Sequence, residues 1–474
     1  MHNAADAGGS HLSRPGFGAI ADRERGLRQS LTTGQLSMIA IGGAIGTGLF
    51  LGSSVAIQLA GPGVLVSYAI GGVITLLLMG CLAEMAVSHP TSGAFGAWAE
   101  HYIGPLAGFL VRYAYWSCIV LAVGTEISAV AVYMQYWFPT LPGWYWIIGF
   151  SAALIGVNAV SVGTFGRVEY WMSLFKVLAI VLFLVLGTWF VVNATPDYDV
   201  GFHNYTALGG FFPRGLGGVW IAVILAIFSY LSVEMIAVAA GEAKEPERAV
   251  PRAFRSTVLR LLLFYLGTLT LVLAIIPWRL AAEGNSPFVK VMQATHVPGA
   301  GGIMNLVILV AALSAMNSQL YITTRMMFSL SRAGHAPRVF GQLNARGVPI
   351  AALLLSSIGI AVAAVLNARM PEKAFTLMIS ISVFGALFTW FMIFVTHWFF
   401  RRKHGAPAGF RLWGFPFTTL FGAAMMAAIL LTTAISRDFK MTLNYGLPFL
   451  ALLVLAWFLY YRRSSVAAAP EATG

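Results

Sequence analysis

Long apolar stretches separated by short polar connections fill most of the chain. A hydrocarbon core about 30 Å thick is crossed by a helix of about 20 apolar residues, so each stretch predicts one membrane-spanning helix. Two longer connections, residues 89–108 and 333–349, contain helix signals, and we expect short helices near the membrane surface there. The twelve predicted spans are residues 35–58, 63–86, 109–137, 144–163, 168–193, 218–240, 258–279, 303–328, 350–367, 375–400, 415–435 and 444–461.

The composition favours one membrane domain over several soluble domains. Hydrophobic residues make up 58% of the chain and charged residues only 10%, whereas a soluble chain averages about 25% charged residues. We therefore expect an all-α polytopic membrane protein with a membrane domain at residues 35–463 and tails at residues 1–34 and 464–474. The two cysteines, Cys81 and Cys118, fall in apolar stretches and are expected to be small buried side chains.

The net charge of +12 raises the question of nucleic-acid binding, and the positions of the 29 basic residues answer it. With a cytosolic N-terminus, 21 lysines and arginines fall on the cytosolic side, seven fall on the opposite side, and Lys176 lies inside a span. This asymmetry is the positive-inside rule, which predicts that both termini are cytosolic. No apolar segment typical of a cleavable signal precedes the first span. The basic excess reflects topology and predicts no nucleic-acid partner.

The first span contains the run GGAIGTG at residues 42–48, and two interpretations fit it. Glycines allow close helix packing in membranes. They also weaken a helix by up to about 1 kcal/mol each, so the helix can break near Gly46. A break would leave the backbone amides of Gly46, Thr47 and Gly48 available to hold a carboxylate.

The sixth span is also unusual, since Phe228, Ser229, Tyr230, Ser232 and Glu234 follow one another within seven positions. A carboxylate in mid-membrane costs about 2.5 kcal/mol or more, so it points to a function or to a brace for a broken backbone. The two irregular spans lie five helices apart. Because five is odd, a five-helix repeat must be inverted, so we predict a 5+5 inverted repeat with helices 1 and 6 discontinuous.

Other ionisable groups lie in or near spans. Lys176 lies in the fifth span and is expected either to turn inward, where it can lose and regain a proton, or to snorkel to the surface. Glu126 in the third span fits a proton partner, a substrate contact or a structural acceptor equally well. Glu84 and Glu169 lie near cytosolic ends of spans, and we expect surface or gate charges there.

Signatures of enzymes are missing from the sequence. It has no HExxH, no GxSxG and no P-loop, and its spans contain no aspartate. We therefore predict no catalytic residues, no metal and no cofactor. Without a nucleotide-binding motif on the chain, we expect transport to be driven by ion gradients or exchange.

Several long motifs resemble the amino acid permeases of the amino acid/polyamine/organocation superfamily, in particular the bacterial amino acid transporter branch. The resemblance covers residues 28–463. The motifs are GGAIGTGLF from Gly42, AEMAVSHPTSGAFGAWAEHYIGPLAGF from Ala83, VEYWMSLFKV from Val168, FSYLSVEMIAVAAGEAKEPERAVPRA from Phe228 and SAMNSQLYITTRMMFSLSRAGHAPRVF from Ser314.

The resemblance implies the leucine-transporter-like fold, in which five plus five inverted helices are followed by two more. By position, Thr47 and Gly48 are similar to the amide donors for the substrate carboxylate. Lys176 matches the lysine that takes the place of an ion in proton-coupled members, which favours H⁺ over Na⁺. Ala44, Phe228 and Leu231 are similar to the carbonyl acceptors for the α-amino group, and Phe228 also to the aromatic lid; Glu234 matches the glutamate of the sixth helix.

The sequence thus predicts a proton-coupled importer of a neutral L-amino acid in the bacterial inner membrane, with H⁺ and the lipid bilayer as its other partners. An exchanger, a sodium symporter or a non-transporting sensor stays open, as does a cationic amino acid or GABA as substrate. The expected substrate-binding residues are Ala44, Ile45, Gly46, Thr47, Gly48, Phe228, Ser229, Leu231, Ser232 and Asn317, and the expected proton-coupling residues are Lys176, Glu126 and Glu234.

Three residues depart from the family pattern. Ser232 stands where many members carry glycine, so the backbone break at this position is less expected. Arg112 stands where an uncharged residue is more usual, and Arg167 where many branch members have an acidic one. Both arginines are expected to affect the cytosolic side.

Overall fold

The computed structural model of the chain describes residues 16–23, 38, 43–91, 93–193, 200–239, 246–284, 286–405 and 410–461. The predicted tails lie outside these residues, apart from α1 (Phe17–Arg23). All regular secondary structure in the described ranges is helical.

Nine helices or helical stretches in the described part are long and apolar enough to cross a membrane. This confirms an all-helical, multi-pass membrane protein. The predicted first and second spans meet in one such stretch, Gly52–Ser88, and the predicted seventh and eleventh spans contain shorter apolar helices, Leu261–Ile275 and Phe417–Thr432. The other stretches are Pro105–Gln135, Gly143–Val160, Val162–Val192, Gly215–Val238, Ala300–Arg332, Ile350–Arg369, Pro371–His404 and Lys440–Tyr460.

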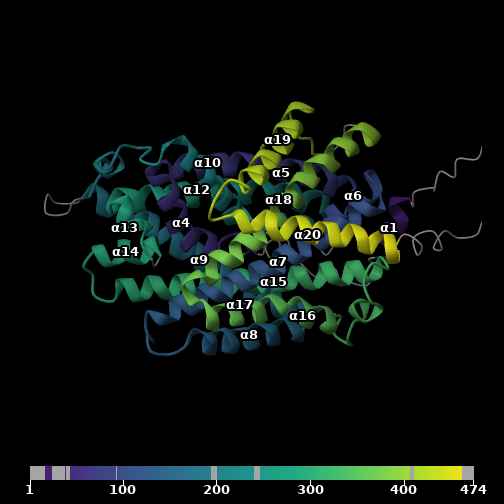
Figure 1. Cartoon of the computed structure of the whole chain (residues 1–474), viewed down its shortest axis with the longest axis horizontal. Helices are drawn as coiled ribbons and strands as arrows, with labels where there is room; N and C mark the ends of the chain where they lie inside the picture. Colours follow the sequence, from purple (N-terminus) through teal and green to yellow (C-terminus); the bar gives the residue numbers. More distant parts are fainter. Residues whose placement is uncertain are drawn as a thin grey trace, which may run out of the picture.

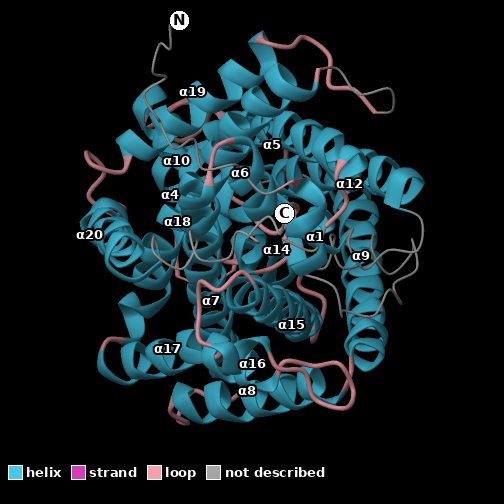
Figure 2. Ribbon diagram, turned by 90° about the vertical axis from the view of Figure 1, so that its right-hand side faces the viewer, coloured by secondary structure: helices cyan, strands magenta, loops and turns pink. Residues whose placement is uncertain are grey.

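Of the nine stretches, the four that are most deeply buried contain the helices α7 (Pro105–Gln135), α10 (Gly215–Tyr230), α15 (Ala300–Arg332) and α18 (Pro371–His404). Figure 2 shows α8 (Gly143–Val160), α9 (Val162–Val192), α19 (Phe417–Thr432) and α20 (Lys440–Ala456) at the periphery of the bundle. The helices α8, α9 and α20 are mostly exposed. The exposed face of α9 is apolar, as a lipid-facing surface must be; it includes Trp171, Leu178, Leu182, Val185 and Trp189.

The first predicted span is interrupted near its middle. Residues 43–44 are helical, Ile45 and Gly46 form a bend, and the helix resumes as α3 (Thr47–Phe50) and α4 (Gly52–Ala60). Gly46 has extended backbone angles, with φ −134° and ψ −152°. This agrees with the break expected from the glycine-rich run, because glycine has a low helix propensity.

The sixth predicted span is interrupted as well. The helix α10 ends at Tyr230, residues 231–234 form a turn, and α11 (Met235–Ala239) follows. Ser232 has φ +82°, a conformation that normally favours glycine. A left-handed non-glycine residue costs about 1–2 kcal/mol. The serine therefore adopts the backbone geometry of the break despite this cost.

The connections hold short helices, drawn with the whole chain in Figure 1. The expected helix after the second span is α6 (Ala94–Tyr102), and the one after the eighth is the 3₁₀ turn η4 (Arg338–Gly341). Arg112 on α7 forms a buried ion pair with Glu100 of α6 at 2.8 Å, so this unusual arginine is neutralised by a partner. The remaining elements are η1 (Gly61–Gly63), α5 (Val64–Ser88), η2 (Phe202–Tyr205), α12 (Pro246–Ile275), α13 (Trp278–Ala282), α14 (Pro287–Ala294), α16 (Ile350–Ser356), α17 (Ile358–Arg369) and the π-helical turn η5 (Trp457–Tyr461).

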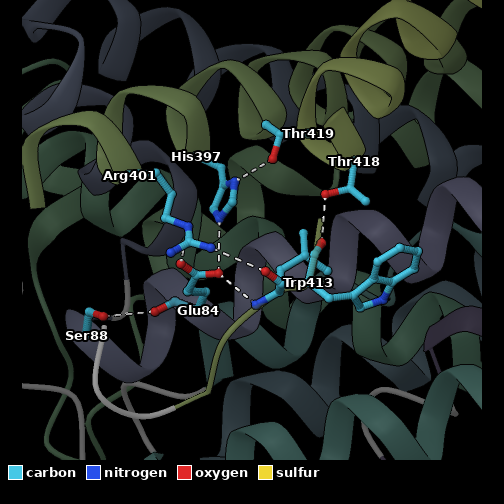
Figure 3. Close-up of polar contacts among 8 residues, drawn as sticks. Glu84, Ser88, His397, Arg401, Trp413, Thr418 and Thr419 are labelled. Atoms are coloured by element: carbon cyan, nitrogen blue, oxygen red, sulfur yellow. Dashed lines mark hydrogen bonds and ion pairs between the residues drawn. The ribbon is translucent and has the colours of Figure 1, made fainter. Parts of the chain in front are cut away.

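A buried polar cluster joins the end of α5 to α18 and to the segment before α19 (Figure 3). The Glu84 carboxylate lies 2.8 Å from Nε of Arg401 and 3.3 Å from Nε2 of His397, and it accepts a hydrogen bond from the Leu412 amide at 2.9 Å. Nδ1 of His397 lies 3.0 Å from the Thr419 hydroxyl on α19. The surface position expected for Glu84 was wrong, because its side chain is fully buried by these partners.

Breaking this ion pair should destabilise the protein more than removing it completely. Glu84→Met or Arg401→Met leaves one buried charge uncompensated, at an expected cost of about 3–5 kcal/mol. The double variant removes both charges, so its loss should be smaller than the sum of the single losses. Thermal unfolding in detergent, followed by tryptophan fluorescence, measures all three. Additive losses would show that the two side chains act independently.

Candidate functional site

The amide freed by the first interruption is held by Glu126. The Thr47 amide donates to a carboxylate oxygen of Glu126 on α7 at 3.0 Å, and both residues are buried. A β-carbon added to Gly46 would lie 2.5 Å from the other carboxylate oxygen and 2.8 Å from Cβ of Ala315. The glycine therefore allows Glu126 to reach the backbone at this point.

Lys176 binds a backbone carbonyl of the same interruption. Its ammonium group donates to the Ile45 carbonyl at 3.0 Å, and its side chain is fully buried on α9. The lysine is thus turned inward and does not snorkel to the surface.

Tyr265 on α12 joins the two interrupted segments. Its hydroxyl lies 2.7 Å from the Ala44 carbonyl, just before the first break, and 2.7 Å from the Ser229 carbonyl, just before the second. Carbonyls near the end of a helical segment lack their usual partner four residues on. Tyr265 therefore places a single hydroxyl donor between two carbonyls that the helices leave free.

The two segments also pack closely against each other. A β-carbon on Gly48 would lie 2.7 Å from Cα of Ser229, and one on Gly43 would lie 3.1 Å from Cβ of Ser232. The Ser229 hydroxyl contacts the Tyr68 hydroxyl at 2.9 Å. The glycine-rich run therefore combines both features considered from the sequence, since it breaks the helix and packs closely.

Glu234 braces the second interruption. Its carboxylate accepts hydrogen bonds from the Ser232 amide at 3.1 Å and from the Tyr115 hydroxyl at 2.8 Å. Tyr115 and Glu126 lie on the same helix, eleven residues apart, which corresponds to about 16 Å along the axis. The two breaks thus contact α7 at well-separated levels, the first at Glu126 and the second, through Glu234, at Tyr115.

Asn317 belongs to a different polar cluster. Its side chain donates to Glu169 at 2.9 Å and accepts from Asn158 at 2.8 Å. Glu169 also accepts hydrogen bonds from Ser314 at 2.5 Å and Ser173 at 2.9 Å. Glu169 was expected to be a surface or a gate charge, and its burial among these donors shows that the surface position was wrong. In this conformation the Asn317 amide is committed to the cluster.

The remaining predicted residues, Phe228 and Leu231, are buried at the end of α10, where the Phe228 carbonyl accepts from the Leu231 amide at 3.2 Å. Sequence reasoning missed Tyr265, Tyr115 and Tyr68. The only signal for each was a tyrosine inside an apolar stretch, and a buried hydroxyl needs a partner. That signal does not say which backbone group the hydroxyl meets.

A larger side chain at Gly46 should disrupt this arrangement. Gly46→Leu would fill the space beside the Thr47 amide that Glu126 and Ala315 now line, so a substrate carboxylate could not approach, and we expect amino acid binding to be lost while the protein stays folded and inserted. The matched control is Gly149→Leu on α8, where an added β-carbon meets no atom within 4 Å. Binding and size-exclusion profiles of both variants are the measurements. Normal substrate affinity in Gly46→Leu would show that this break takes no part in binding the substrate.

The sequence was compared with known proteins. The amino acid permease family model matches residues 35–467. The chain is 37% identical to the uncharacterized amino acid permease YtnA of Bacillus subtilis, with 94% of this chain and 98% of the relative covered. It is 36% identical to the gamma-aminobutyric acid permease of the same organism (93% and 95%) and 34% identical to the aromatic amino acid transport protein AroP of Salmonella typhimurium (91% and 94%). The chain therefore belongs to the amino acid permease family, whose members are membrane transporters and not enzymes.

Proposed function

We propose that the chain is a secondary active transporter that imports a neutral L-amino acid by proton symport and alternating access. One observation carries the proposal. Backbone groups of two interrupted helices converge on buried Glu126, Lys176 and Tyr265. Such interruptions, facing each other inside a bundle, are the usual way to bind a small zwitterion at mid-membrane.

The proposed binding site consists of the two interrupted segments. The amides around Gly46–Gly48 would receive the substrate carboxylate, and the carbonyls of Ala44 and of residues 228–231 would receive its amino group. Phe228 would cover the site. Ile45, Ser229, Ser232 and Asn317 complete the proposed set, and Glu234 is the brace of the second break.

The names of the relatives support a substrate without a charged side chain. One is a gamma-aminobutyric acid permease and another an aromatic amino acid transport protein. Both kinds of substrate carry a carboxylate and an amino group, and neither needs an ionic partner for a side chain. We therefore favour a neutral amino acid over a cationic one.

Proton coupling is supported by Lys176. Its ammonium already donates to a carbonyl of the first interruption, where a bound Na⁺ would need oxygen ligands free of other partners. We propose that protonated Lys176 holds the Ile45 segment and favours one facing of the site, and that loss of the proton releases it.

The proposed topology has twelve spans arranged as a 5+5 inverted repeat plus two helices, with residues 35–463 as the membrane domain. The basic asymmetry of the connections supports cytosolic N- and C-terminal tails at residues 1–34 and 464–474. The membrane is proposed to be the bacterial inner membrane.

Uptake by the purified protein in sodium-free liposomes tests this function. A panel of L-amino acids and GABA is offered with and without an inward proton gradient. We expect at least one neutral L-amino acid to accumulate only when the gradient is present. Uptake that requires an amino acid inside the vesicle would indicate an exchanger, and binding without uptake would indicate a sensor.

The coupling role of Lys176 gives a separate prediction. Lys176→Met should abolish the acceleration of uptake by an inward pH gradient but spare substrate binding, because the side chain carries no titratable group. Lys176→Arg should be nearly inactive, since arginine keeps its proton. The readout is radiolabelled uptake at fixed external and varied internal pH.

The control for these variants is Lys373→Met, the same change at an exposed lysine, which should behave as the wild type. Gradient-driven accumulation by Lys176→Met would move the coupling site to Glu126 or Glu234.

A further inference from the structure

The backbone groups proposed to bind an amino acid already have partners of matching chemistry within the chain. The Thr47 amide donates to the Glu126 carboxylate at 3.0 Å. The Ala44 and Ser229 carbonyls both face the Tyr265 hydroxyl at 2.7 Å. A carboxylate on the amide and a donor between the carbonyls are the same contacts that the two ends of an amino acid would make.

We infer that Glu126 and Tyr265 are internal substitutes for the carboxylate and the ammonium group of the substrate, and that an amino acid binds by exchanging with both of them. This inference rests on the proposed function, since it concerns the same site. It adds two residues whose effect on binding is competition with the substrate.

The Glu126 contact must be given up when a substrate carboxylate arrives. One backbone N–H serves one carboxylate well, and two carboxylates at the same amide repel each other. The displaced side chain has a destination in Lys176, whose ammonium group holds the Ile45 carbonyl, two residues before the Thr47 amide. Movement of Glu126 toward Lys176 would draw the ammonium away from the Ile45 carbonyl that it now holds. Substrate binding would thereby loosen the first interrupted segment.

The Tyr265 hydroxyl cannot donate a full hydrogen bond to both carbonyls. A tyrosine hydroxyl carries one hydrogen, yet two buried carbonyls lie within 2.7 Å of its oxygen. One of the two carbonyls is therefore left without a full donor. An ammonium group has three hydrogens and can serve both carbonyls. The exchange thus favours the amino group of a substrate over the hydroxyl.

Two variants, each measured with carboxylate-only and amine-only probes, test the inference. Each variant should relieve competition for only one of the two charged groups of the substrate. Glu126→Gln replaces the carboxylate by a weaker, neutral acceptor, and Tyr265→Phe removes the hydroxyl. The probes are L-leucine with 4-methylpentanoate and 3-methylbutylamine, and L-phenylalanine with 3-phenylpropionate and phenethylamine. Each set contains the amino acid, its carboxylate half and its amine half. Equilibrium binding in detergent is measured for every pair of variant and probe.

We expect Glu126→Gln to tighten binding of the carboxylate-only probes about tenfold and to leave the amine-only probes unchanged. Tyr265→Phe should do the reverse, and each variant should tighten binding of the full amino acids. The controls are Glu372→Gln and Tyr445→Phe, the same changes at exposed residues, which should leave every affinity unchanged.

Two patterns would overturn the inference. If both variants bind all probes more weakly, Glu126 and Tyr265 brace the site and do not compete with the substrate. If a variant changes the affinities for the carboxylate-only and amine-only probes equally, its residue does not substitute for one particular end of the amino acid. In both cases a wild type that binds amino acids leaves the proposed function standing. If the wild type binds no L-amino acid of the uptake panel, the proposed function fails and this inference fails with it.

Discussion

In the hydrocarbon core of a membrane no water is available to a free backbone group, so each break in a helix must be satisfied by the protein itself. This chain breaks a helix at Ile45–Gly46 and again at residues 231–234. Lys176, Glu126, Tyr265 and Glu234 supply the partners, and all four side chains are buried. The polar chemistry of the site follows from this need, because a group that stabilises an interrupted backbone also lies beside any ligand bound there.

The glycines of the first segment make these contacts possible. Gly46 gives Glu126 room beside the break, and Gly48 lets the first segment approach the backbone of Ser229. Helix breaking and close packing are therefore two effects of the same small residues. Ser232 shows that glycine is not essential for the second break, since its amide is held by Glu234 while its backbone takes a left-handed conformation.

Away from the breaks, buried carboxylates fix helices to one another. Glu169 gathers hydroxyl and amide donors from α9 and α15. Glu84 joins α5 to α18 and to the segment before α19 (Figure 3). Both residues lie near predicted span ends, where surface or gate charges were expected. Their burial depends on donors that come from distant parts of the sequence, at Ser314, Asn317, Arg401 and Leu412.

Local features of the sequence were enough to predict the class of the protein and the positions of the two irregular spans. Apolar length is a local property, and the resemblance rests on contiguous motifs, so the helical membrane fold, the family and the two helix breaks could all be predicted. Sequence could not decide which partner each freed backbone group has. Glu126 fitted three roles equally well, and Lys176 fitted two orientations. Tyr265 was a tyrosine in an apolar stretch, with no sign of which group it contacts. Tertiary structure decided these points, because Thr47 and Glu126 are 79 positions apart and Ala44 and Tyr265 are 221 apart, and only the packing of α7, α9 and α12 around the breaks brings such groups within hydrogen-bonding distance.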